Sequence, residues 1–266
     1  MTPPSSDINQ KTKKDLLPAQ RQSLIKDFLV KTGFVSIADL GAEFGVSEMT
    51  IRRDLDELQN QGLIQRTYGG AVSTEPTFFE MSFQAKCSQC EEEKKRIGIA
   101  AANLIDDGQT ILLDSGTTTD QITKNIKDKH VTIISNALNI ISEAMKSPNV
   151  EVMVAGGMLR KGLNYTMGPQ TSDFMKTIRA DVVFLAVEGV DERAGFTVPD
   201  LFNADNKRAM IEAAQKVIVV TDHSKLGRVS TSSIIKLNQA HLIITGKEAD
   251  RNIISQLEKH IEVMLV

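Results

Sequence analysis

The chain has 266 residues, a formal net charge of −3 at pH 7 and 24% charged residues. This length allows one small domain and one domain of ordinary size. The mildly acidic balance excludes a bulk attraction to nucleic acid, so any affinity for DNA must come from locally placed cations. No apolar run is long enough to span a membrane, and the first residues lack the apolar core of a signal peptide. We therefore expect a cytoplasmic protein.

The N-terminal part of the chain predicts a polar tail and a small helical domain. Residues 1–16 contain Pro, Ser and Lys without periodicity, which predicts a disordered tail. Residues 17–72 predict three helices, of which the first opens at Leu17 with apolar residues at helical spacing. The second helix is expected over residues 37–44 and the third over residues 47–58.

A helix-turn-helix followed by a wing is predicted within this domain. Ser36 and Ser47 can cap the second and third helices, and Gly45-Val46 supplies the tight turn between them. The runs Gly62-Leu63-Ile64 and Arg66-Thr67-Tyr68-Gly69-Gly70 then predict a β-hairpin, because the two glycines can take a positive φ.

The third helix has the residues needed to read DNA. Its apolar stripe of Ile51, Leu55 and Leu58 leaves Arg52 and Arg53 on another face, near the N-terminal end. Arginine suits this position because its planar guanidinium group can donate two hydrogen bonds to a guanine base or a phosphate. Two adjacent arginines on a helix usually belong only to a solvated face. Here it is the order of caps, turn, helix and wing around them that favours DNA binding. The candidate DNA-binding residues are Ser36, Ser47, Met49, Thr50, Arg52, Arg53, Arg66 and Tyr68.

Residues 73–90 form the predicted linker between two domains. They carry phenylalanines and a proline without a clean period, which indicates a linker with apolar anchors. Cys87 and Cys90 are the only cysteines and form a lone Cys-x-x-Cys with no histidine nearby in the sequence. A zinc site would lack ligands there. We expect neither a metal nor a cofactor.

Residues 91–266 predict an α/β domain with a mostly parallel sheet. After a charged and then Ala-rich helix over residues 92–105, apolar strands alternate with amphipathic helices, which is typical of a parallel sheet covered on both faces. The predicted strands are residues 110–113, 131–134, 150–154, 182–186, 217–220 and 242–244. Ligands of such sheets bind beyond the carboxyl ends of the strands.

Polar or Gly-rich residues follow five of these strands. The turn after the first strand, residues 114–119, combines Ser, Gly and Thr before a helix and so suits a phosphate, although an ordinary Gly turn with Thr caps has the same pattern. Together the strand ends predict a pocket for a phosphorylated, hydroxyl-rich small molecule. The candidate residues are Asp114, Ser115, Gly116, Thr117, Thr118, Asn136, Gly156, Gly157, Glu188, Asp191, Asp222 and Lys225.

The same residues give no support for several enzyme classes. No Gly-x-Ser-x-Gly elbow surrounds Ser115, and His223 lies beside Asp222 without an identifiable nucleophile, so a capping or packing role is favoured for it. There is no phosphate loop of nucleotide hydrolases and no Gly-x-Gly-x-x-Gly after a strand.

From about Gln20 to the C-terminus, the chain resembles the DeoR-type bacterial transcriptional regulators of sugar catabolism. Residues 46–55 are similar to the family's recognition helix, and residues 68–71 to its wing. Further matching motifs are Glu93-Lys94, Asp114-Ser115-Gly116-Thr117-Thr118, Gly156-Gly157, Lys207-Arg208-Ala209-Met210 and Asp222-His223-Ser224-Lys225. The resemblance implies a sensor domain similar to sugar-phosphate isomerases and CoA transferases, and it adds Lys207 to the candidate effector-binding residues.

Five positions depart from the family's pattern. Tyr68 replaces a more usual His, and Ser135-Asn136-Ala137 replaces Thr-Asn-Ser but keeps the Asn. Glu188 stands where Asp or Asn is common. Asn206 lies near the place where the related isomerases keep a catalytic carboxylate, and an amide cannot act as a general base.

We therefore expect a non-enzymatic repressor of a carbohydrate-catabolism operon, released from operator DNA by a phosphorylated sugar. A weak similarity favours an amino-sugar or sugar-alcohol derivative. A homo-oligomer, dimer or tetramer, is expected because one helix reads few bases. Two alternatives stay open: a sugar-phosphate isomerase with an accessory DNA-binding domain, and a transcriptional activator.

Overall fold

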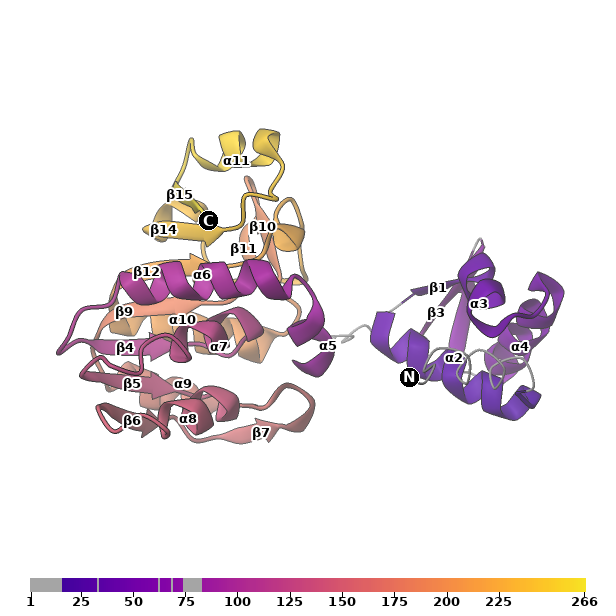
Figure 1. Ribbon diagram of the computed structural model, residues 1–266, viewed down its shortest axis with the longest axis horizontal. Helices are drawn as coiled ribbons and strands as arrows, with labels where there is room; N and C mark the ends of the chain where they lie inside the picture. Colours follow the sequence, from indigo (N-terminus) through magenta and orange to yellow (C-terminus); the bar gives the residue numbers. More distant parts are fainter. Residues whose placement is uncertain (1–15, 33, 62, 68, 74–82) are drawn as a thin grey trace, which may run out of the picture. The chain divides into compact units, whose positions relative to one another are not determined.

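The computed structural model describes residues 16–32, 34–61, 63–67, 69–73 and 83–266 (Figure 1). The chain divides into two compact units, Met1–Met81 and Ser82–Val266. No helix within the described ranges is long and apolar enough to cross a membrane.

The first unit is a helix-turn-helix with a small antiparallel sheet, as the sequence predicts. Its elements are α2 (Pro18–Thr32), β1 (Phe34–Ser36), α3 (Ile37–Phe44), α4 (Glu48–Asn60), β2 (Ile64–Thr67) and β3 (Gly70–Ser73). The strand order is β1-β3-β2, so the wing hairpin gains a third strand that was not predicted. Tyr68, in the hairpin turn, lies outside the described residues.

Local signals in the sequence account for the ends of α3 and α4. The hydroxyl of Ser36 accepts a hydrogen bond from the Asp39 amide at 3.0 Å, and Ser47 caps α4 in the same way. Gly45 ends α3 with a φ of 62°, a left-handed conformation that glycine adopts without steric cost. The helices pack through Ile25, Leu40, Phe44, Ile51, Leu55 and Leu58, all fully buried.

The second unit is built on a seven-stranded parallel sheet (Figure 1). In spatial order its strands are β15 (Glu262–Leu265), β14 (Leu242–Thr245), β12 (Ala214–Val220), β9 (Ala180–Leu185), β4 (Thr110–Leu113), β5 (Val131–Ser135) and β6 (Val150–Val154). All six predicted strands are present, and β15 is an additional edge strand.

Helices cover both faces of this sheet and bury two apolar cores. One face is covered by α6 (Glu91–Asn103), α7 (Thr117–Thr123) and α8 (Leu138–Ala144), and the other by α9 (Pro169–Lys176), α10 (Leu201–Ala213) and α11 (Arg251–Leu257). Within β4, Ile111 and Leu113 belong to the first core and Leu112 to the second, as the alternation of a strand requires.

Two small antiparallel sheets were not predicted. One pairs β7 (Met158–Arg160) with β8 (Tyr165–Met167), and the other has the order β10 (Gly189–Asp191), β11 (Gly195–Val198), β13 (Ser232–Ser233). Part of the predicted linker is also helical: α5 (Phe83–Ser88) precedes α6 and contacts α7 in the second unit.

Candidate functional site

The N-terminal end of α4 presents an exposed polar and basic surface. Ile51, Leu55 and Leu58 are buried beneath it, whereas Arg52 and Arg53 are exposed. The guanidinium of Arg52 lies 3.6 Å from the carboxylate of Glu48, and both side chains are largely exposed. Such a pair contributes little stability, so Arg52 is available to exchange this partner for a phosphate or a base.

Ser47 at the N-cap and Arg66 of the wing both form contacts with residues of α4. The Ser47 hydroxyl lies 3.0 Å from that of Thr50 and accepts from the Thr50 amide at 3.3 Å. Arg66, on β2, donates to the carbonyl oxygen of Arg52 at 3.2 Å and forms an ion pair with Asp56. Arg66 therefore joins the wing to the reading helix, and any DNA contact by it would have to compete with Asp56.

In the second unit, a buried ion pair lies at the carboxyl ends of the central strands. Asp114 follows β4 and pairs with Lys207 of α10, and each side chain is 2% exposed. The same carboxylate oxygen accepts a hydrogen bond from the Ala186 amide at 3.0 Å. Asp114 therefore joins the segment after β9 to α10, and its charge is neutralised by Lys207.

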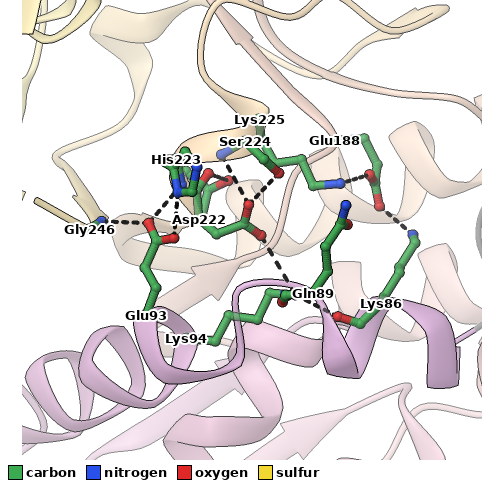
Figure 2. A network of polar contacts seen from close by, with 11 residues as sticks. Lys86, Gln89, Glu93, Lys94, Glu188, Asp222, His223, Ser224, Lys225 and Gly246 are labelled. Carbon is green, nitrogen blue, oxygen red and sulfur yellow. Dashed lines mark hydrogen bonds and ion pairs between the residues drawn. The ribbon is translucent and has the colours of Figure 1, made fainter. Parts of the chain in front are cut away.

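Glu188, in the segment after β9, bridges two lysines. Its Oε2 lies 2.7 Å from Nζ of Lys225, and its Oε1 pairs with Nζ of Lys86 on α5 (Figure 2). Burial opposes ionisation of this carboxyl, but the two ammonium groups outweigh that effect and lower the pKa of Glu188 to about 2. Two cations therefore share one carboxylate.

Asp222, after β12, is the third carboxylate of the cluster. It accepts from the hydroxyl of Ser224 at 2.5 Å and from its amide at 3.1 Å, and lies 3.7 Å from Nζ of Lys94 (Figure 2). Lys94 also donates to the carbonyl oxygens of Lys86 and Gln89, at 2.6 and 2.7 Å. Burial lowers the pKa of Lys94, and the charge of Asp222 opposes this shift.

Glu93 holds the neighbouring loops in place. Its Oε1 accepts from the amides of His223 and Gly246 at 2.7 and 3.0 Å, and its Oε2 lies 2.6 Å from Nδ1 of His223 (Figure 2). The fold thus brings a histidine beside Cys90, which the sequence analysis did not foresee, and potential ligand atoms of Cys90, Glu93 and His223 lie within 4.8 Å of one another. We assign no metal to them, because Nδ1 of His223 and Oε2 of Glu93 bind each other directly at 2.6 Å.

The predicted phosphate turn lies between β4 and α7. Thr117 and Thr118 are buried, whereas Ser115 and Gly116 are partly exposed. A Cβ atom built on Gly116 would lie 2.6 Å from that of Ala186, so glycine allows this turn to approach the segment after β9. The turn therefore lies against the segment after β9, whose Ala186 amide also donates to the Asp114 carboxylate.

The contacts of four further predicted positions lie outside this cluster. The amide of Asn136 donates to the carbonyl oxygen of Thr166 at 2.7 Å. Gly156 and Gly157 line a separate cavity of about 660 Å³ with Met158, Gln170 and Phe174. The carboxylate of Asp191 accepts two backbone amides in the turn of the β10–β11 hairpin, both at 2.8 Å.

Sequence reasoning did not select Lys86 or Lys94 as site residues. Lys86 falls in the segment that was assigned to the linker, and no sequence motif around it indicates a binding site. Lys94 belongs to the Glu93-Lys94 motif of the resemblance, but only the fold shows that it contacts Asp222.

Comparisons with known proteins agree with this architecture. Residues 21–77 match a family model described as a DeoR-like helix-turn-helix domain, and residues 89–247 match one described as the DeoR C terminal sensor domain. The HTH-type transcriptional regulator GlpR of Haloferax volcanii is 34% identical over 91% of this chain and 95% of its own length. The glycerol-3-phosphate regulon repressor of Escherichia coli K12 is 31% identical over 91% of this chain and 96% of its own. Among solved structures, the sorbitol operon regulator SorC of Klebsiella pneumoniae aligns with a TM-score of 0.43 and 13% identity, covering 96% of this chain and all of that one.

Proposed function

The chain belongs to the DeoR family of transcriptional regulators, and on this basis we propose that it represses a carbohydrate-catabolism operon. The observation that carries the proposal is the combination, in one chain, of an exposed arginine-bearing helix and a lysine-rich cluster at the ends of parallel strands. The first suits a DNA duplex and the second suits a small anion.

Operator binding is assigned to α4, placed in the major groove. Arg52 and Arg53 are exposed at its first turns, where a recognition helix contacts base edges and phosphates. One such helix reads few base pairs, so we propose a homodimer or tetramer on repeated half-sites. A cytoplasmic location follows from this role, because that is where the operator is.

The proposed effector is a phosphorylated sugar or sugar alcohol. Lys225, which shares Glu188 with Lys86, supplies positive charge, while the Ser115–Thr118 turn supplies hydroxyl groups and amides. The relative from Escherichia coli is named for the glycerol-3-phosphate regulon, which is consistent with this class of ligand. Amino-sugar phosphates stay within the same class.

Release from the operator follows from linkage. If the effector binds more tightly to a conformation with low operator affinity, it reduces DNA binding by the ratio of its two affinities. We propose binding without turnover, because the carboxylates at hand are poor general bases. Asp114 is paired with Lys207, Glu188 has a pKa of about 2, and position 206 is an amide.

The test is a thermal-shift screen of the full chain against pentose, hexose, amino-sugar and polyol phosphates, followed by operator titrations. We expect one compound to raise the melting temperature and to weaken operator binding. The proposal would be contradicted if the protein bound no DNA fragment from the region upstream of its own gene. Formation of an isomerised product, followed by NMR, would favour the enzyme alternative, and a reporter gene that needs the protein for expression would favour an activator.

A further inference from the structure

Lys86 connects the segment that follows the DNA-binding unit to the strand-end cluster. The first unit ends at Met81, and α5 begins at Phe83. From α5 the Lys86 ammonium reaches Glu188, a residue 102 positions further along the chain (Figure 2). Both side chains are mostly buried, at 14% and 21% exposure, so solvent screens this pair only in part.

The backbone of the same segment is held by a second lysine. Lys94 donates to the carbonyl oxygens of Lys86 and Gln89, while its ammonium lies 3.7 Å from Asp222. The C-terminal end of α5 is thus anchored through Glu188 and through Asp222 (Figure 2). Both carboxylates belong to loops at the carboxyl ends of the sheet.

Glu188 differs from the other carboxylates of the cluster because it is shared by two lysines. Asp114 has Lys207 and Asp222 has Lys94, but Glu188 faces both Lys86 and Lys225. One carboxylate is therefore shared by two ammonium groups, each of which can also bind another anion. An anion that arrives between the two lysines competes with Glu188 for them.

We infer that Lys86 is an effector-site residue that exchanges Glu188 for the anionic group of the effector and thereby changes how α5 is anchored. The inference rests on the proposed function, and it names Lys86 as the residue through which the effector site changes operator affinity. Because α5 is covalently continuous with the DNA-binding unit, a change in its anchoring reaches the residues that lead to that unit. A ligand shifts such an equilibrium only through differential contacts, and the Lys86 ammonium supplies one.

The anchor can be tested in the full chain without any ligand. Amide exchange of residues 83–88 is compared in the wild type, Lys86→Met and the control Lys95→Met, whose half-exposed lysine pairs with Glu91 and Glu92 of its own helix. We expect protection in α5 to fall about threefold to fivefold in Lys86→Met, the size expected when a partly exposed ion pair is lost, and to stay unchanged in the control. Glu188→Gln breaks the same pair from the other side and should reproduce the loss. Unchanged protection in both variants overturns the inference.

The coupling is tested with the sugar-phosphate panel and inorganic phosphate as probes. The ratio of operator dissociation constants with and without a saturating compound is measured for the wild type, Lys86→Met, Lys86→Arg and Lys95→Met. We expect the ratio to approach one in Lys86→Met and to stay near the wild-type value in the other two. A wild-type ratio in Lys86→Met overturns the inference. If no compound changes the operator affinity of the wild type, the effector part of the proposed function fails. The amide-exchange experiment still tests whether Lys86 anchors α5.

Discussion

Arg21 and Asp54 form a buried, two-pronged ion pair between α2 and α4, the proposed DNA-reading helix. The Nε atom of Arg21 lies 2.5 Å from Oδ2 of Asp54, and a second guanidinium nitrogen lies 3.2 Å from Oδ1. The two side chains are 8% and 4% exposed. Asp54 is next to Arg53 in sequence, so the pair holds in place the helix whose opposite face is proposed to meet DNA.

Replacement of Arg21 by Met should destabilise the DNA-binding unit. The change leaves the Asp54 carboxylate buried without its cation, which costs about 3–5 kcal/mol in comparable buried pairs. Urea unfolding of the full chain, followed by pulse-labelled amide exchange, reports each unit separately. Arg53→Met, at an exposed position, serves as the control and should leave the free energy of unfolding within about 0.5 kcal/mol of the wild type. If the DNA-binding unit were as stable in Arg21→Met as in Arg53→Met, a structural role for this pair would be contradicted.

Removal of the Arg52 side chain should strongly weaken operator binding while the effector still binds. A base or phosphate contact by arginine is worth about 1–3 kcal/mol, and its loss should also reduce the slope of log affinity against log salt by about one. Fluorescence anisotropy with an operator duplex measures both quantities. Lys26→Ala removes the same charge from the exposed side of α2 and is expected to bind normally. Equal affinities for Arg52→Ala and Lys26→Ala would count against α4 as the reading helix.

Thr117→Ala and Lys225→Ala should leave operator binding intact but prevent release by the effector. Thr117 begins α7 at the proposed phosphate turn, and Lys225 pairs with Glu188 at the strand ends. The measurement is the concentration of sugar phosphate that releases half of the operator, which should rise at least about tenfold when a charge-assisted hydrogen bond is lost. Lys247→Ala, at an exposed lysine, is the control. Normal release by either variant would place the pocket elsewhere.

The pH dependence of stability should identify Glu188 as an ionised, lysine-held carboxylate. Its pKa is lowered from 4.5 to about 2, so the stabilisation is present above about pH 4.5 and is lost as the pH falls towards 2. The melting temperature of Glu188→Gln should therefore lie below that of the wild type at about pH 5, and the difference should shrink towards about pH 3. Glu258→Gln, on an exposed surface, should show no such change. A difference that is constant with pH would mean that Glu188 acts through its shape alone.

Local sequence signals were sufficient for most of the architecture. Ser36, Ser47 and Gly45 mark helix ends because their interactions are with backbone groups a few residues away. The central strands were recognisable because a strand buried on both faces is apolar throughout. The strand β15 was missed although Val263, Met264 and Leu265 are apolar, because so short a run does not show that it pairs with β14.

The sequence by itself determined the order of the main elements, the helix-turn-helix and the strand ends that carry polar residues, since each depends on contacts between near neighbours in the chain. Only the tertiary structure decided which charges meet. Asp114 and Lys207 are 93 residues apart, and Lys86 and Glu188 are 102 apart. Ion pairs between such distant positions have no local pattern, because they form only after the sheet has brought its carboxyl ends and α5 together.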